Sequence, residues 1–197
     1  KRDVRTDPGS LINFLVGQGL GEGTDVLLID ESLCVRCGNC EKACADVHDG
    51  TSRLDRGTGP TFANIHVPTS CRHCENPHCM KDCPPDAIHR NPNGEVFIDN
   101  DSCIGCGNCQ RNCPYGVIQL AQVNPKRGAP SLWAWLLTGL TTEPGREKDY
   151  HNENLGKKAV KCDMCKDLRG GAACVRACPT GAAIRVSPEK FIEYASK

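Results

Sequence analysis

Residues 103–114 read CIGCGNCQRNCP: four cysteines separated by two, two and three residues, followed at once by a proline. Residues 34–44 (CVRCGNCEKAC) repeat this spacing, with Ala45 in place of the proline. A loop with a cysteine at every third residue can turn three thiolates toward one centre, and glycines such as Gly105 and Gly107 let the backbone approach closely. In bacterial iron–sulfur proteins with this spacing, the fourth cysteine of each run binds a neighbouring cluster. The spacing therefore predicts [4Fe–4S] clusters.

All 16 cysteines of the chain fall into four such groups, and none lies outside them. Groups two and four are looser, with internal spacings of two, four and three residues and of two, eight and three residues. Group one is Cys34, Cys37, Cys40 and Cys44; group two is Cys71, Cys74, Cys79 and Cys83; group three is Cys103, Cys106, Cys109 and Cys113; group four is Cys162, Cys165, Cys174 and Cys178.

Two other uses of cysteine are less consistent with this pattern. Disulfide frameworks suit short secreted chains and do not require a CxxC pair at the start of every group. Zinc is usually held by two CxxC-like knuckles that lie well apart in the sequence. The spacing therefore favours iron–sulfur clusters over zinc, and zinc over disulfides.

The composition is poor in residues that build a hydrophobic core. Only 5% of the 197 residues are aromatic, whereas the cysteines amount to about 8%, near the range of a cysteine-defined scaffold. We therefore expect folding to depend on bound clusters more than on apolar burial. The 24 basic and 24 acidic residues balance, which argues against a nucleic-acid partner.

No stretch of the sequence approaches the roughly 18–20 apolar residues of a membrane-spanning helix, so we expect no transmembrane segment. The best run is LWAWLLTGL at 132–140. The beginning, KRDVRTDPGS, lacks the layout of an uncleaved signal peptide and an initiator Met, so we expect a trimmed start or a longer polypeptide. We expect a cytoplasmic location, including association with a membrane complex.

Short apolar runs flank the cysteine groups and predict strands. They precede groups at 26–29, 96–98 and 159–160, and they follow groups at 87–88, 117–118 and 182–186. Each unit then consists of a strand, a cluster loop, a short helix and a strand, which is half of a two-cluster domain. The pattern predicts an α+β fold with an internal repeat.

Two segments lie outside this repeat. Residues 1–25 contain an apolar patch and a run of glycines, and we interpret them as an extension or linker. Residues 119–158 form an insertion with the only two tryptophans, Trp133 and Trp135. Because Trp is enriched at binding hot spots, we favour docking of a partner subunit there. A lid over the chain's own clusters and peripheral membrane contact are the alternatives.

The sequence resembles a known family over roughly residues 29–186. The stretch CRHCENPHCMKDCPPDAIHRNPNGEVFIDNDSCIGCGNCQRNCPYG and the later KCDMCKDLRGGAACVRACPTGAAI are similar to the four-cluster electron-transfer subunits of the dimethyl sulfoxide reductase family. Hydrogenases and formate dehydrogenases have related subunits. The resemblance implies four [4Fe–4S] clusters.

The resemblance also implies which cysteines share a cluster. Group one pairs with group four and group two with group three, and the fourth cysteine of each group joins three from its partner. The implied sets are Cys34, Cys37 and Cys40 with Cys178; Cys162, Cys165 and Cys174 with Cys44; Cys71, Cys74 and Cys79 with Cys113; and Cys103, Cys106 and Cys109 with Cys83.

This pairing predicts two ferredoxin-like two-cluster domains, one inserted in the other. Residues 26–66 and 159–197 would form the outer domain, and residues 67–118 the inserted domain. Residues 1–25 and 119–158 would be added to this pair.

The implied function is an electron relay with no catalytic site of its own. Single electrons would pass through the clusters between a catalytic partner and an electron donor or acceptor in a hetero-oligomeric oxidoreductase. The partner would be of the molybdopterin, flavin or hydrogenase type. A free multi-cluster ferredoxin and a redox- or metal-sensing iron–sulfur protein are the alternatives.

Several other residues near the cysteines have simpler interpretations. We expect His73 and His78 to lie beside the clusters or at the surface, because every ligand position already holds a cysteine. Asp30, Asp99 and Asp101 are expected to cap turns. A solvated face and a docking or potential-raising patch are equally consistent with the basic residues around group four: Lys157, Lys158, Lys161, Lys166, Arg169 and Arg176.

Overall fold

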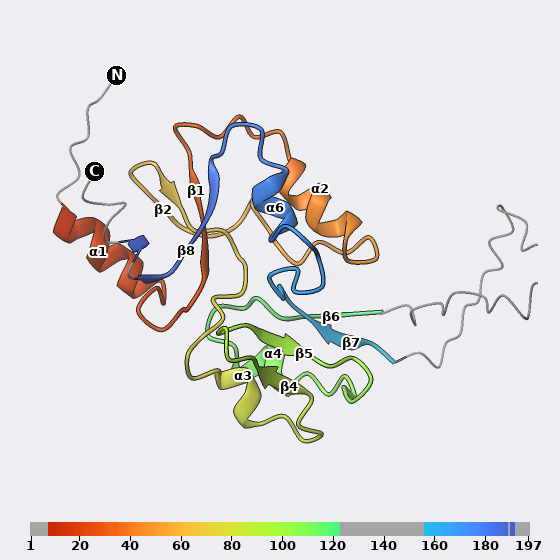
Figure 1. The fold of residues 1–197 in the computed structure, drawn as a ribbon. Helices are drawn as coiled ribbons and strands as arrows, with labels where there is room; N and C mark the ends of the chain where they lie inside the picture. Colours follow the sequence, from red (N-terminus) through yellow and green to blue (C-terminus); the bar gives the residue numbers. More distant parts are fainter. Residues whose placement is uncertain (1–7, 123–155, 189, 192–197) are drawn as a thin grey trace, which may run out of the picture.

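The computed structural model describes residues 8–122, 156–188, 190 and 191. The described chain is a loop-rich α+β structure of short helices and small sheets, as the sequence predicts (Figure 1). Trp133 and Trp135 lie outside the described residues, so the docking hypothesis for them stays a prediction. Within the described ranges, no helix has the length and apolar character required to cross a membrane.

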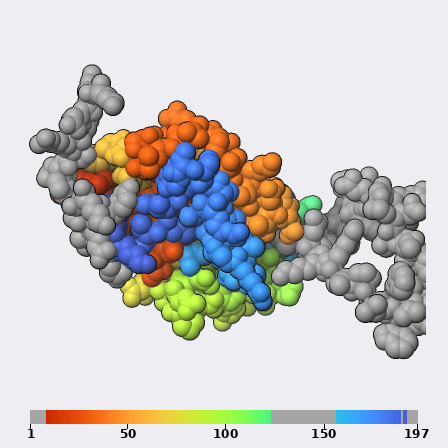
Figure 2. All heavy atoms as spheres, turned by 45° about the horizontal axis from the view of Figure 1, so that its top comes forward, coloured from red at the N-terminus to blue at the C-terminus, as the bar shows by residue number. Residues whose placement is uncertain are grey.

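Segments from both ends of the chain build the largest sheet. Its strands are β1 (Val26–Asp30), β2 (Thr61–Phe62), β3 (Ile65–His66) and β8 (Ala183–Val186), in the order β2-β3-β1-β8. β1 is buried along its whole length, and its antiparallel pairing with β8 places Val26 opposite Val186. The first and last cysteine groups are therefore brought to the same part of the molecule (Figures 1 and 2).

Two cysteine-bearing helices pack against each other beside this sheet. They are α2 (Asn39–Asp46) and α6 (Ala173–Arg176). Cys44 of α2 and Cys174 of α6 share a core with Leu27 and Ile29 of β1. The sheet thus positions groups one and four relative to each other.

The middle of the chain forms a second set of elements. They are α3 (His78–Lys81), β4 (Ile88–Arg90), β5 (Val96–Ile98) and α4 (Asn108–Asn112). The two strands form an antiparallel hairpin with Ile88 opposite Ile98, and α3 contacts α4. A further hairpin pairs β6 (Gln119–Ala121) with β7 (Lys158–Val160).

Most of the predicted strands are confirmed. The runs at 26–29, 96–98, 159–160 and 182–186 overlap β1, β5, β7 and β8, and β4 begins at Ile88. The run at 117–118 differs, because β6 begins one residue later, at Gln119. Val117 and Ile118 are both buried in the core around β4 and β5. The apolar run therefore predicts a buried segment here, but it does not predict the residue at which strand β6 begins.

The N-terminal segment also differs from the expected extension or linker. Residues Pro8–Gly17 form helix α1, and Leu11, Phe14 and Leu15 pack against the sheet. Their spacing of three and four residues gives the helix one apolar face. This helix covers part of the core that the strands alone leave open.

Candidate iron–sulfur sites

All four cysteine groups share one backbone turn. The residue directly before the second cysteine has a positive φ in each: Arg36 (56°), His73 (50°), Gly105 (69°) and Met164 (55°). A left-handed backbone costs a non-glycine residue roughly 1–2 kcal/mol. Strain of this kind persists where the surrounding structure requires it, often at functional sites. The four groups therefore share a left-handed residue at this one position although their spacings differ.

Three pockets are each lined by three cysteines of one group and the fourth cysteine of another. Site 1 contains Cys34, Cys37, Cys40 and Cys178; site 3 contains Cys71, Cys74, Cys79 and Cys113; and site 4 contains Cys83, Cys103, Cys106 and Cys109. The structure thus brings these cysteines together in the combinations that the resemblance implied.

The remaining cysteines, which we call site 2, are Cys44, Cys162, Cys165 and Cys174. Burial raises the pKa of the Cys165 and Cys174 thiols, and the charge of Cys44 adds to the shift in both. Arg185 Nη2 donates a hydrogen bond to Cys162 Sγ at 2.9 Å. Site 2 therefore combines cysteines from α2, α6 and the loop after β7.

A charged network joins groups one and four beside site 2. His48 Nε2 lies 3.0 Å from Asp163 Oδ1, and Arg53 Nη1 donates to Asp163 Oδ2 at 2.6 Å. Burial opposes protonation of His48, but its hydrogen bonds to Asp163 and Cys44 raise its pKa to about 9. Burial alone would raise the pKa of the Asp163 carboxyl, yet His48 and Arg53 hold that pKa well below the usual range. His48 and Arg53 were not identified from the sequence, because no spacing connects them to Asp163.

The cysteine sets fit [4Fe–4S] clusters in number and in surroundings. All sixteen thiols are free of disulfides. Backbone N–H groups donate to four of the sulfur atoms, as such groups do to thiolates that bind iron. The donors are those of His73 to Cys71 (3.4 Å), Arg53 to Cys44 (3.3 Å), Ala87 to Cys83 (3.3 Å) and Ala173 to Cys165 (3.5 Å).

Burial makes several of these thiols weak acids in the metal-free chain. It raises the pKa of Cys74 and Cys162 to about 11 and that of Cys79 to about 12. Because iron binds thiolates, cluster assembly must release these protons.

The sites differ in their exposure to solvent. Cys37 of site 1 and Cys106 of site 4 are exposed, whereas the other fourteen cysteines are buried or partly buried. Val35 and Ile104, each directly after the first cysteine of its group, are 64% and 63% exposed. Sites 1 and 4 therefore reach the surface, and sites 2 and 3 do not present an exposed cysteine.

Asp30, Asp99, His73 and His78 have the simpler roles. Asp30 accepts hydrogen bonds from Ser32, and Asp99 accepts them from the turn that follows it. His78 is exposed. His73 is fully buried, and burial together with the positive charges of Lys161 and Arg185 lowers its pKa well below the ordinary value.

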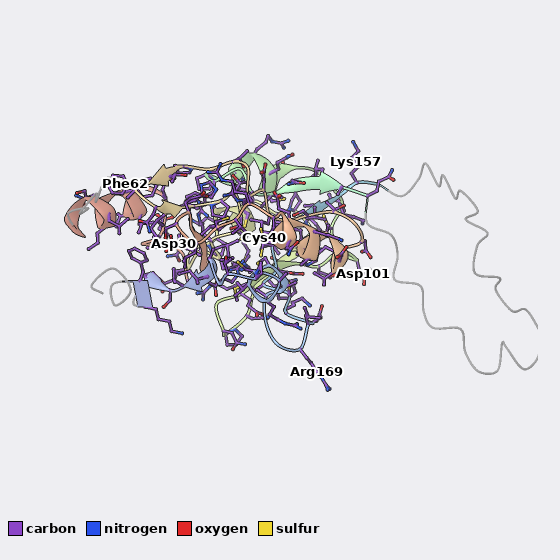
Figure 3. All side chains as sticks on the ribbon, turned by 90° about the horizontal axis from the view of Figure 1, so that it is seen from above. Asp30, Cys40, Phe62, Asp101, Lys157 and Arg169 are labelled. Atoms are coloured by element: carbon purple, nitrogen blue, oxygen red, sulfur yellow. The ribbon has the colours of Figure 1, made fainter. Side chains whose placement is uncertain are left out.

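The basic residues around group four do not form a single surface. Lys157, Lys166, Arg169 and Arg176 are exposed, and Figure 3 shows Lys157 and Arg169 at the periphery. Lys158 is partly buried and donates to the Cys103 carbonyl, and Lys161 is buried. Arg56 and Arg185, which contact Cys34 and Cys162, were not identified from the sequence because each is distant from its cysteine along the chain.

Comparison with known proteins agrees with this chemistry. Residues 62–127 and 95–179 each match a family model described as a 4Fe-4S dicluster domain, and residues 27–44 match a 4Fe-4S binding domain.

Curated relatives match most of the chain. The arsenate respiratory reductase iron-sulfur subunit ArrB of Shewanella sp. (strain ANA-3) is 32% identical over 80% of this chain and 79% of its own length. The electron transport protein HydN of Escherichia coli (strain K12) is 31% identical over 87% and 93%. The thiosulfate reductase electron transfer subunit PhsB of Salmonella typhi is 33% identical over 80% and 72%.

The cysteine loops and the dicluster matches define an iron–sulfur protein of the ferredoxin type. The chain belongs to the iron–sulfur electron-transfer subunits of the dimethyl sulfoxide reductase family, and it binds [4Fe–4S] clusters.

Proposed function

We propose that the chain holds one [4Fe–4S] cluster at each of sites 1 to 4 and relays single electrons along them. The observation that carries this proposal is the convergence of four thiols from two cysteine groups at the pockets of sites 1, 3 and 4. Each cluster takes one electron from its neighbour and passes it on, while the protein excludes water and sets the potential. The inserted-domain arrangement, with residues 67–118 between the two outer segments, belongs to the same proposal.

Shared elements support the order 1-2-3-4. Helix α2 carries cysteines of sites 1 and 2, and α4 with the residue after it carries cysteines of sites 4 and 3. Between sites 2 and 3, the charge of Cys71 adds to the effect of burial in raising the pKa of Cys162. Neighbouring sites along this order thus share a helix or an electrostatic contact.

The exposed cysteines support sites 1 and 4 as the places where electrons arrive and leave. Cys37 and Cys106 lie at the two ends of the proposed order. Exposed Val35 and Ile104 beside them offer apolar contact to a partner protein. Electrons would therefore exchange with other proteins at the ends and not at sites 2 and 3.

The relatives support a catalytic subunit as the partner. Two of them are named as subunits of an arsenate and a thiosulfate reductase, and another is named formate hydrogenlyase subunit 2. We infer a hetero-oligomer in which this chain serves a catalytic subunit of the molybdopterin, flavin or hydrogenase type. Copurification of the native chain followed by size-exclusion chromatography tests this; elution as a lone chain would favour a free ferredoxin.

Serine substitution of the fourth cysteine in group one or in group four tests the proposed ligand sets. In Cys44→Ser we expect loss of the site 2 cluster, with the signal of the site 1 cluster retained. The matched variant Cys178→Ser should have the reverse effect. Iron analysis and EPR spectra of the reduced chain measure both, and loss of the same cluster in the two variants would refute the cross-ligation.

A further inference from the structure

Lys161 lies between the two interior sites. It directly precedes Cys162 of site 2 and is only 3% exposed. Its Nζ donates to the Cys162 carbonyl at 3.0 Å and to the Val96 carbonyl. The same side chain lines the pocket of site 3, beside Cys71 and Cys79. One lysine thus contacts the surroundings of both sites.

No ion pair joins this lysine to a carboxylate in the part of the chain that the structure describes. Arg185, the neighbouring part-buried cation, differs because it pairs with Asp25. A buried charge without an opposing charge is strongly unfavourable. Two carbonyl oxygens compensate Lys161 only in part, so negative charge nearby would stabilise it further.

The cysteine sites on either side supply that charge when they hold clusters. A [4Fe–4S] cluster with four thiolate ligands is anionic, and it becomes more so on reduction. Positive charge in a poorly solvated interior stabilises the more negative state, and net charge is one determinant of cluster potential. The effect falls on the two sites closest to the cation.

We propose that Lys161 is a buried positive charge shared by sites 2 and 3, which raises the reduction potentials of both interior clusters. The inference rests on the cysteine sets proposed above. The positive charge of Lys161 stabilises the reduced state of the clusters at sites 2 and 3, where no cysteine is exposed. It neither ligates iron nor carries the electron.

The test is Lys161→Met in the full chain loaded with iron and sulfide. EPR-monitored redox titration measures each cluster, with Cys44→Ser and Cys113→Ser identifying the signals of sites 2 and 3. At a fixed potential we expect the reduced-to-oxidised ratio at both sites to fall by about tenfold, which corresponds to about 59 mV for a one-electron couple. The ratios at sites 1 and 4 should change far less.

Two variants control for effects other than the buried charge. Lys161→Arg keeps the positive charge and should keep both potentials near those of the wild type. Lys157→Met removes the same charge from an exposed lysine just before β7 (Figure 3), where water and salt screen it. It should leave all four potentials unchanged.

Unchanged potentials in Lys161→Met with full iron content would overturn the proposal, as would an equal shift at all four sites. If Lys161→Met does not retain its iron, Lys161→Gln, which can still donate to a carbonyl, carries the same expectation. Iron loss in both neutral variants but not in Lys161→Arg would show a role in retention and overturn the role in potential. A wild-type chain without four clusters would instead contradict the proposed function.

Discussion

Sites 1 and 4 differ from sites 2 and 3 more in their surroundings than in their cysteines. The open sites use the two regularly spaced groups, and each has an exposed cysteine, Cys37 or Cys106. The interior sites use the looser groups and have the buried Lys161 and the part-buried Arg185 beside them. In the proposed relay, identical ligand chemistry would serve exchange with partners at the ends and stabilisation of electrons in the middle.

Removal of the iron should abolish this difference altogether. With chelator under reducing conditions, we expect cooperative thermal unfolding to disappear, because thiolate–iron bonds replace a weak hydrophobic core. Circular dichroism during heating measures the transition. A compact apo-chain that unfolds cooperatively would contradict the expectation.

Two isoleucines line site 4, one on its buried side and one on its open side. Ile88 is 1% exposed and Ile104 is 63% exposed. Ile88→Ala should lower the free energy of unfolding by about 2–5 kcal/mol, whereas Ile104→Ala should change it by no more than about 0.5 kcal/mol. Anaerobic urea unfolding of the iron-loaded chain compares them, and equal losses would show that the open side is also packed.

Alanine substitutions of glycines in the loops of sites 1 and 4 separate the cost of backbone strain from the cost of steric crowding. Gly38 has φ +75° and open space where a Cβ would lie, so Gly38→Ala should cost only the roughly 1–2 kcal/mol of a left-handed backbone. Gly105 has φ +69°, and a Cβ there would collide with the Lys157 carbonyl oxygen. Gly105→Ala should therefore destabilise the chain more. The same urea titration measures both, and a smaller loss for Gly105→Ala would contradict the crowding.

A cation at an open site should affect potential less than one in the interior. Arg56 Nη2 lies 3.4 Å from Cys34 Sγ of site 1, and its side chain is 17% exposed. Because Glu31 pairs with Arg56 and offsets its charge, Arg56→Met should lower the reduced-to-oxidised ratio there by less than the change expected for Lys161→Met. Redox titration of the two variants side by side measures the difference, and a larger shift in Arg56→Met would reverse the contrast between open and interior sites.

Much of this molecule is encoded locally in its sequence. The cysteine spacings predict the cluster type, and the runs at 26–29 and 96–98 predict β1 and β5, because a thiol triplet and a short apolar strand each depend on adjacent residues. The spacing of Leu11, Phe14 and Leu15 also indicates the apolar face of α1. This segment could have been identified as a helix from its sequence, but the glycines that follow it favoured a linker.

The surroundings of the clusters depend on contacts between residues far apart in the chain. His48 and Asp163 are separated by 115 positions and Arg185 and Cys162 by 23, yet each pair is in hydrogen-bond contact. Lys161 is one of several basic residues around group four in the sequence, and only folding shows that it is buried while Lys157 is exposed. Ligand type follows from covalent spacing, whereas burial and electrostatic field arise from every element packed around a site and therefore exist only in the tertiary structure.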